Sequence, residues 1–100
     1  MSSGVQISKT GVYKGTGAAM DVRSVGFRPR RVELFAETRL VNALWTDTMT
    51  EGRGLKRVTG GTMSLIVVGG GVTPLSDGFR IGTDADLNAL DGVVHWIAHE

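Results

Sequence analysis

Cysteine is missing from the sequence, proline occurs only twice in 100 residues, and long apolar runs are missing as well. Without cysteine the chain can form neither a disulfide nor a thiolate metal site. The longest apolar run is Leu65–Val68, far shorter than the roughly 20 residues that a membrane-spanning helix needs. The first eleven residues hold no apolar stretch, so we expect no secretory signal and synthesis in the cytosol.

Net charge is nearly absent, because 11 basic residues face 10 acidic ones and leave a charge of +1. This balance provides no long-range field that would attract nucleic acid or an acidic membrane. No dense run of Lys and Arg provides one locally. We therefore expect neither nucleic acid nor a membrane among the partners.

Catalytic motifs are also lacking. The sequence holds no GxSxG nucleophile elbow and no GxxxxGK[ST] phosphate loop. Gly15-Thr16-Gly17 lacks the third glycine of a dinucleotide fingerprint, since Met20 and Asp21 follow. We expect no enzyme, and therefore neither catalytic nor cofactor-binding residues.

Glycine is plentiful, with 15 residues, and 41% of the chain is hydrophobic. Many glycines favour tight turns and strands over helices, because glycine is costly inside a helix. The length suits a single core. We expect one domain over residues 11–100, preceded by a flexible or partner-ordered arm over residues 1–10.

Alternating apolar and polar residues predict strands. In Val93–His99, residues Val94, Trp96 and Ala98 share one face. With the strand Phe79–Ile81 and the Asp- and Asn-rich turn Thr83–Asp91, this segment predicts a hairpin or a sheet corner. Further strands are expected at Gly11–Gly15, Met20–Val25, Arg31–Glu37, Leu40–Thr46, Leu55–Val58 and Thr62–Val68, with an irregular Val72–Leu75.

These short strands, separated by turns, predict an all-β fold. We expect an antiparallel β-sandwich, jelly-roll-like, with seven to nine short strands. The predicted core consists of Val22, Val32, Leu34, Trp45, Leu65, Val67, Phe79, Val94 and Trp96.

Two patterns resemble sets of metal ligands, but each departs from the residues or the spacing that a metal site requires. Asp84-x-Asp86-x-Asn88 resembles the opening of a calcium loop, but alanine replaces the glycine of position six and His95 replaces the glutamate of position twelve. An Asx-type turn is the better interpretation. His95 and His99 lie about 13 Å apart along a strand, too far to chelate one ion. We expect no metal site.

Two segments carry a resemblance to a protein family. The first contains Tyr13, Gly15-Thr16-Gly17, Gly26-Phe27-Arg28-Pro29 and Val32, and the second is GFRIGTDADLNALDGVVHWIAHE at Gly78–Glu100. In this order they resemble a pattern in small β-rich structural proteins of tailed bacteriophages. The resemblance implies a virion protein without catalytic residues.

Within that family we expect a capsid decoration or cement protein. It would bind the major capsid protein of the same phage and stabilise the assembled head shell. We expect a homo-oligomer, with a homotrimer favoured at local threefold positions. Two alternatives stay open: a tail, baseplate or fibre component with a glycan-binding surface, and a carbohydrate-binding module without a virion role.

Arginines form the densest basic group of the sequence. Arg28, Arg30 and Arg31 are candidates for docking on a partner, because the planar guanidinium pairs with carboxylates in a fixed geometry. Phe35 is expected on the polar face of its strand, where it would be an anchor beside another subunit. If Trp45 or Phe35 is exposed, the glycan-binding alternative gains support.

Overall fold

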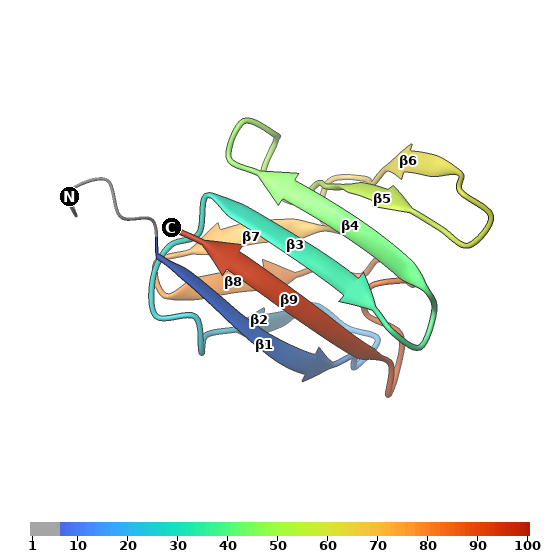
Figure 1. Cartoon of the computed structure of the whole chain (residues 1–100), viewed down its shortest axis with the longest axis horizontal. Helices are drawn as coiled ribbons and strands as arrows, with labels where there is room; N and C mark the ends of the chain where they lie inside the picture. Colours follow the sequence, from blue (N-terminus) through green and yellow to red (C-terminus); the bar gives the residue numbers. More distant parts are fainter. Residues whose placement is uncertain (1–6) are drawn as a thin grey trace.

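The computed structural model describes residues 7–100, which form two antiparallel β-sheets (Figure 1). The larger sheet has the order β1-β9-β3-β4-β5-β6 and the smaller one the order β2-β8-β7. The strands are β1 (Ser8–Lys14), β2 (Met20–Val22), β3 (Arg31–Ala36), β4 (Val41–Thr46), β5 (Leu55–Arg57), β6 (Met63–Leu65), β7 (Val72–Leu75), β8 (Gly78–Ile81) and β9 (Val93–His99). The prediction of an all-β antiparallel sandwich is confirmed.

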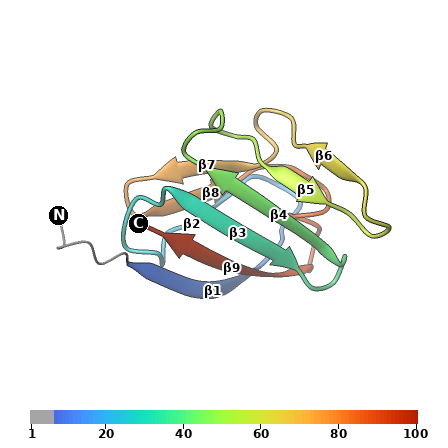
Figure 2. The same ribbon diagram turned by 45° about the horizontal axis from the view of Figure 1, so that its top comes forward.

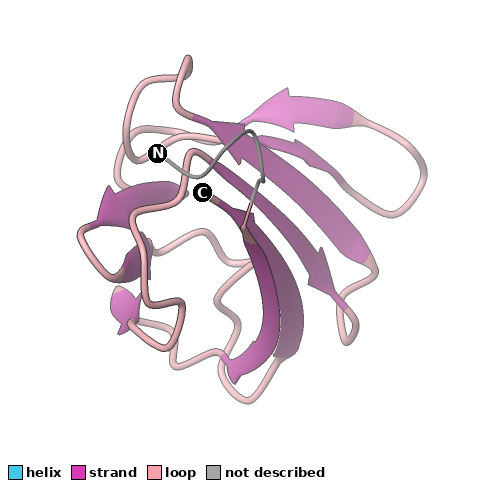
Figure 3. Ribbon diagram, turned by 60° about the vertical axis from the view of Figure 1, so that its left-hand side comes forward, coloured by secondary structure: helices cyan, strands magenta, loops and turns pink. Residues whose placement is uncertain are grey.

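The two sheets pack as layers, with the larger sheet curving over the smaller one (Figure 3). Strand β9 follows the predicted alternation, and Val94, Trp96 and Ala98 are buried. Trp96 meets Phe79 of the smaller sheet edge-to-face, with ring centroids 5.7 Å apart. Such an aromatic pair contributes about 1 kcal/mol beyond its buried area, so it helps to hold the layers together.

The segment Gly78–Glu100 forms a sheet corner and not a hairpin. Strand β8 belongs to the smaller sheet and β9 to the larger one. The polar loop between them crosses from layer to layer. Strand β7, expected to be irregular, pairs with β8, and its Pro74 lies on the edge of the smaller sheet. Proline is tolerated there because an edge residue need not donate to a neighbouring strand.

The predicted core is confirmed except at Leu65, the last residue of β6, and at Val67, which follows the strand. Leu65 and Val67 were expected inside but are 54% and 72% exposed, whereas Ile66 between them is only 3% exposed. The hairpin of β5 and β6 extends beyond the smaller sheet (Figures 1 and 2). No second layer therefore covers this strand, and only Ile66 turns back to the core. All three residues of β6 are exposed, Ser64 included, so the strand has no buried face.

The chain enters the larger sheet earlier than expected. Strand β1 begins at Ser8, and Ser8 and Lys9 pair with His99 and Ala98 of β9. The arm predicted over residues 1–10 is therefore wrong for Ser8–Thr10, while residues 1–6 lie outside the described part. Among residues 7–100 there is no helix of the length and apolarity needed to cross a membrane.

Candidate interaction surface

The side of the larger sheet that faces away from the smaller sheet, here called the outer face, carries two adjacent rows of side chains. Antiparallel pairing aligns the rows across neighbouring strands. The first row contains Ile97, Glu33, Leu44, Leu55 and Leu65, and the second contains Val12, His95, Phe35, Asn42, Arg57 and Met63. Apolar side chains thus extend from β1 to β6 without a second layer above them.

A groove of about 470 Å³ lies on this outer face. Phe35, Leu44 and Leu55 contribute apolar surface, and Asn42 and Arg57 contribute polar groups along it. Phe35 is 46% exposed, as predicted for its position on the polar face. A concave apolar surface with a few polar groups has the composition of a binding site.

Phe35 is held in place by a neighbour on β9. Its ring stacks on His95, with centroids 6.5 Å apart and planes inclined by 20°. The His95 imidazole in turn lies 2.6 Å from Glu37 Oε1. The stack limits the rotamers of Phe35, so a partner that packs on this ring loses less side-chain entropy.

The outer side of the smaller sheet has the opposite character. Arg80 donates to Asp21 at 2.8 Å, and Arg23 donates to Asp77 at 2.8 Å and to Asp21 at 3.1 Å. The hydrogen bond from Arg80 lowers the pKa of the Asp21 carboxyl. These pairs leave a polar, charge-neutralised surface that suits contact with water. The two outer sides therefore differ, and the apolar one is the candidate for binding.

The predicted arginine group divides between two places. Arg28 and Arg30 lie beside a smaller hollow of about 250 Å³ at one end of the sandwich. Arg28 is 3.3 Å from Glu51, and Arg30 is 3.1 Å from Asp47. Exposed pairs of this kind contribute about 0–1 kcal/mol. Both arginines can therefore exchange their own acid for a partner's carboxylate at small cost.

Arg31 lies on the outer face, on the same side of β3 as Phe35 and four residues before it. Its guanidinium is 3.5 Å from Glu33, which stands between Arg31 and Phe35 on the same side of the strand. Of the four predicted interface residues, Arg31 and Phe35 thus share one surface, and Arg28 and Arg30 lie at the strand ends.

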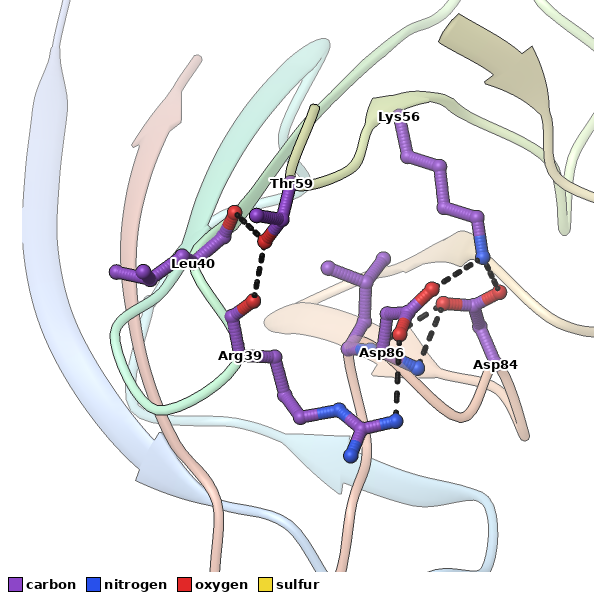
Figure 4. Close-up of polar contacts among 7 residues, drawn as sticks. Arg39, Leu40, Lys56, Thr59, Asp84 and Asp86 are labelled. Carbon is purple, nitrogen blue, oxygen red and sulfur yellow. Dashed lines mark hydrogen bonds and ion pairs between the residues drawn. The ribbon is translucent and has the colours of Figure 1, made fainter. Parts of the chain in front are cut away.

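The acidic loop that resembles a calcium site is occupied by a lysine of the larger sheet (Figure 4). Lys56 Nζ donates to Asp84 at 2.6 Å and to Asp86 at 2.9 Å. The second oxygen of Asp84 accepts the backbone N–H groups of Asp86 and Leu87, each at 3.2 Å, which confirms the predicted Asx-type turn. Arg39 adds a longer contact of 3.5 Å to Asp86.

The charges in this loop compensate each other. Burial lowers the pKa of Lys56, but hydrogen bonds to Asp84 and Asp86 outweigh burial and raise it overall. The bond from Lys56 lowers the pKa of Asp86, against the opposing effect of burial. Within residues 7–100 no group of three or more His, Asp or Glu is arranged to hold a metal ion.

Asn88, the third polar residue of this loop, has a different role. It is 2% exposed, and its amide bonds to three backbone groups. Nδ2 donates to the carbonyls of Ala18 at 2.6 Å and Gly82 at 2.8 Å, while Oδ1 accepts from the N–H of Thr16 at 2.8 Å. The side chain of Asn88 therefore links the turn after β1 to the loop before β9 by hydrogen bonds.

The two segments that carry the phage resemblance meet at this point. Besides the Asn88 bonds, the Tyr13 hydroxyl donates to the Leu87 carbonyl at 2.7 Å, and Gly15 N–H donates to the Gly92 carbonyl at 2.8 Å. Burial raises the pKa of the Tyr13 hydroxyl, so the group stays neutral. Residues of the two segments thus build one structural junction. Sequence reasoning assigned them to turns but did not pair them.

The remaining candidate residues are His95, His99 and Trp45. His95 and His99 lie on one strand, and the imidazole of His99 is 3.4 Å from Glu33. Trp45 is only 1% exposed, so it offers no stacking surface. No protein-family model, curated protein or solved structure matches the chain.

Proposed function

We propose that this protein is a non-enzymatic structural protein of a tailed-phage virion, which decorates the assembled head shell from outside. The resemblance at Tyr13–Val32 and Gly78–Glu100 supports the virion part of the proposal. The contrast between the two outer sides of the sandwich supports the docking part, and it is the observation on which we rely most. The partner is the major capsid protein of the same phage.

The outer face has the features of a protein-docking surface. Aromatic and aliphatic side chains form the centre of such interfaces, with charged groups around them. Here Phe35 and Leu44 are central, while Arg31, Glu33 and Arg57 surround them. Binding to the assembled shell in preference to free subunits would stabilise the shell by mass action. The homotrimer stays a prediction based on shell symmetry.

A second candidate is a tail, baseplate or fibre component with a glycan-binding surface. The exposed ring of Phe35 in a groove with Asn42 and Arg57 favours it, because sugars stack on aromatic faces next to polar groups. Burial of Trp45 removes the larger of the two stacking candidates. A glycan array with the purified protein separates this function from decoration.

The copy number of the chain per purified particle tests the proposal. Quantitative mass spectrometry against the major capsid protein is expected to give a number comparable to that of the capsid protein. A value one or two orders of magnitude lower would assign the chain to the tail or to a unique vertex. Absence from particles would refute a virion function.

A further inference from the structure

Within residues 7–100 the two sheets end in four edge strands, and three of them are protected against pairing with another strand, β7 in part by its own bridge from Val72 to Arg53. The edge strand β1 carries Lys9 and Lys14, β7 has Pro74 in the middle, and β2 is short and holds Asp21. Charge, proline and shortness are the usual means by which proteins block edge pairing. Strand β6, Met63–Leu65, is short too, but it lies within Thr62–Val68, which has neither charge nor proline.

The backbone of β6 leaves its outward groups available. On the inward side, the Thr62 carbonyl accepts from Val58 N–H at 3.0 Å, and Ile66 N–H donates to the Gly54 carbonyl at 2.7 Å. Alternate residues of an antiparallel strand direct their N–H and C=O groups to opposite sides. The groups of Met63 and Leu65 therefore point away from β5. Within residues 7–100 no strand pairs with that side.

The side chains on this edge are apolar and exposed. Met63 and Leu65 are 50% and 54% exposed, and Val67 and Val68, which follow, are 72% and 61% exposed. An uncharged run of this kind with strong β-propensity is a site for strand addition. A free monomer would keep both the unpaired backbone and the apolar side chains in water.

We propose that β6 pairs with β6 of a second copy of this chain, antiparallel and about a two-fold axis. With Ser64 opposite Ser64, Met63 of each copy stands opposite Leu65 of the other. The outward N–H and C=O groups of both residues then find partners in both copies. The strand is thus complementary to itself, as a two-fold interface requires.

Charge and topology favour a second copy over a different chain. The net charge of +1 leaves little repulsion between two copies. Joining the β6 edges also makes the larger sheets continuous, so the rows that end at Leu65 and Met63 on one copy continue on the other. The contact is closed, because each copy uses its β6 edge once. It does not depend on the virion proposal. The contact is predicted for the free protein in solution, whereas the homotrimer expected on symmetry is a prediction for the protein bound to the shell.

Sedimentation velocity and light scattering on the purified full chain test the contact. We expect a mass twice that of the chain, falling to the monomer mass in Leu65→Pro and in Met63→Lys. The proline removes an outward N–H group without touching the bonds to β5, and the lysine sets a charge in the contact. The matched control Val12→Lys, also exposed on the outer face but on β1, is expected to stay dimeric.

Amide hydrogen exchange of the unmodified protein gives a readout that needs no variant. The N–H groups of Met63 and Leu65 are expected to be slowly exchanging at high protein concentration and fast on dilution. A monomer at about 100 μM, a trimer mass, or a dimer in which these two amides exchange rapidly would overturn the proposal. Copy number per particle is a separate measurement, so failure here does not alter the test of the proposed function.

Discussion

Replacing Asn88 by alanine removes the amide that joins the turn after β1 to the loop before β9. Three hydrogen bonds disappear, with lengths of 2.6, 2.8 and 2.8 Å. Each is worth about 1 kcal/mol net. The Gly82 carbonyl is also buried and would lose this partner, which adds about 1 kcal/mol for an unsatisfied group. We expect the free energy of unfolding to fall by about 3–4 kcal/mol.

Urea unfolding followed by tryptophan fluorescence measures this loss, because Trp45 and Trp96 are both buried. For a domain of this size, 1 kcal/mol corresponds to about 4–8 °C in Tm, so a thermal scan should show a decrease well above 10 °C. Asn42→Ala is the matched control, because Asn42 is exposed on β4, and its loss should stay within about 0.5 kcal/mol. A loss below about 1 kcal/mol for Asn88→Ala would refute the role assigned to this amide.

Further predictions concern backbone proximity, pH and the arginine group. In Gly78→Ala the new methyl group would collide with the Val22 carbonyl, so we expect the free energy of unfolding to fall by about 1–3 kcal/mol. In the control Gly92→Ala the methyl group would come no closer than 3.2 Å to its neighbours. The same urea titration should show a smaller loss of unfolding free energy for this control. Because the pKa of Asp86 is lowered in the folded state, its contribution is present above the unfolded pKa of about 3.9 and is lost as pH falls below it. Asp86→Asn should therefore reduce the fall in urea midpoint between pH 7 and pH 3, and an unchanged fall would contradict the pairing with Lys56. A triple variant removes the arginine side chains, with the changes Arg28→Ala, Arg30→Ala and Arg31→Ala. We expect it to bind particles more weakly in pull-down assays while its thermal stability changes little. Unchanged binding would exclude these arginines from the interface.

Local sequence patterns correctly predicted those strands whose inner face is covered by the other sheet. In β9 the alternation of Val94, Trp96 and Ala98 was sufficient, because the smaller sheet covers that face along the strand. The same reasoning failed at Leu65 and Val67, since alternation identifies two faces but does not say which of them a second layer covers. Strand β6 lies at the uncovered end of the larger sheet, where Met63, Ser64 and Leu65 are all exposed.

Contacts between distant segments could not be derived from the sequence. Lys56 pairs with Asp84 of the acidic loop, 28 residues later in the sequence, and Asn88 forms a hydrogen bond with Thr16, 72 residues earlier. The motif indicated a turn at Asp84, which was correct, but no local signal names the residue that neutralises it. The acids that pair with Arg28 and Arg30 likewise come from the β4–β5 connection, so the sequence showed a basic group where the structure has paired charges.

Docking through the outer face of the larger sheet, as proposed, is tested by the binding of purified protein to phage particles from which this chain has been removed, measured by co-sedimentation. We expect Phe35→Asp and Leu44→Asp to abolish binding, because each places a charge in the apolar groove, while the folded state persists. Thr73→Asp, opposite Arg80 on the smaller sheet, is expected to bind like the unmodified chain. Equal binding by all three variants, or loss only in Thr73→Asp, would contradict docking through this face.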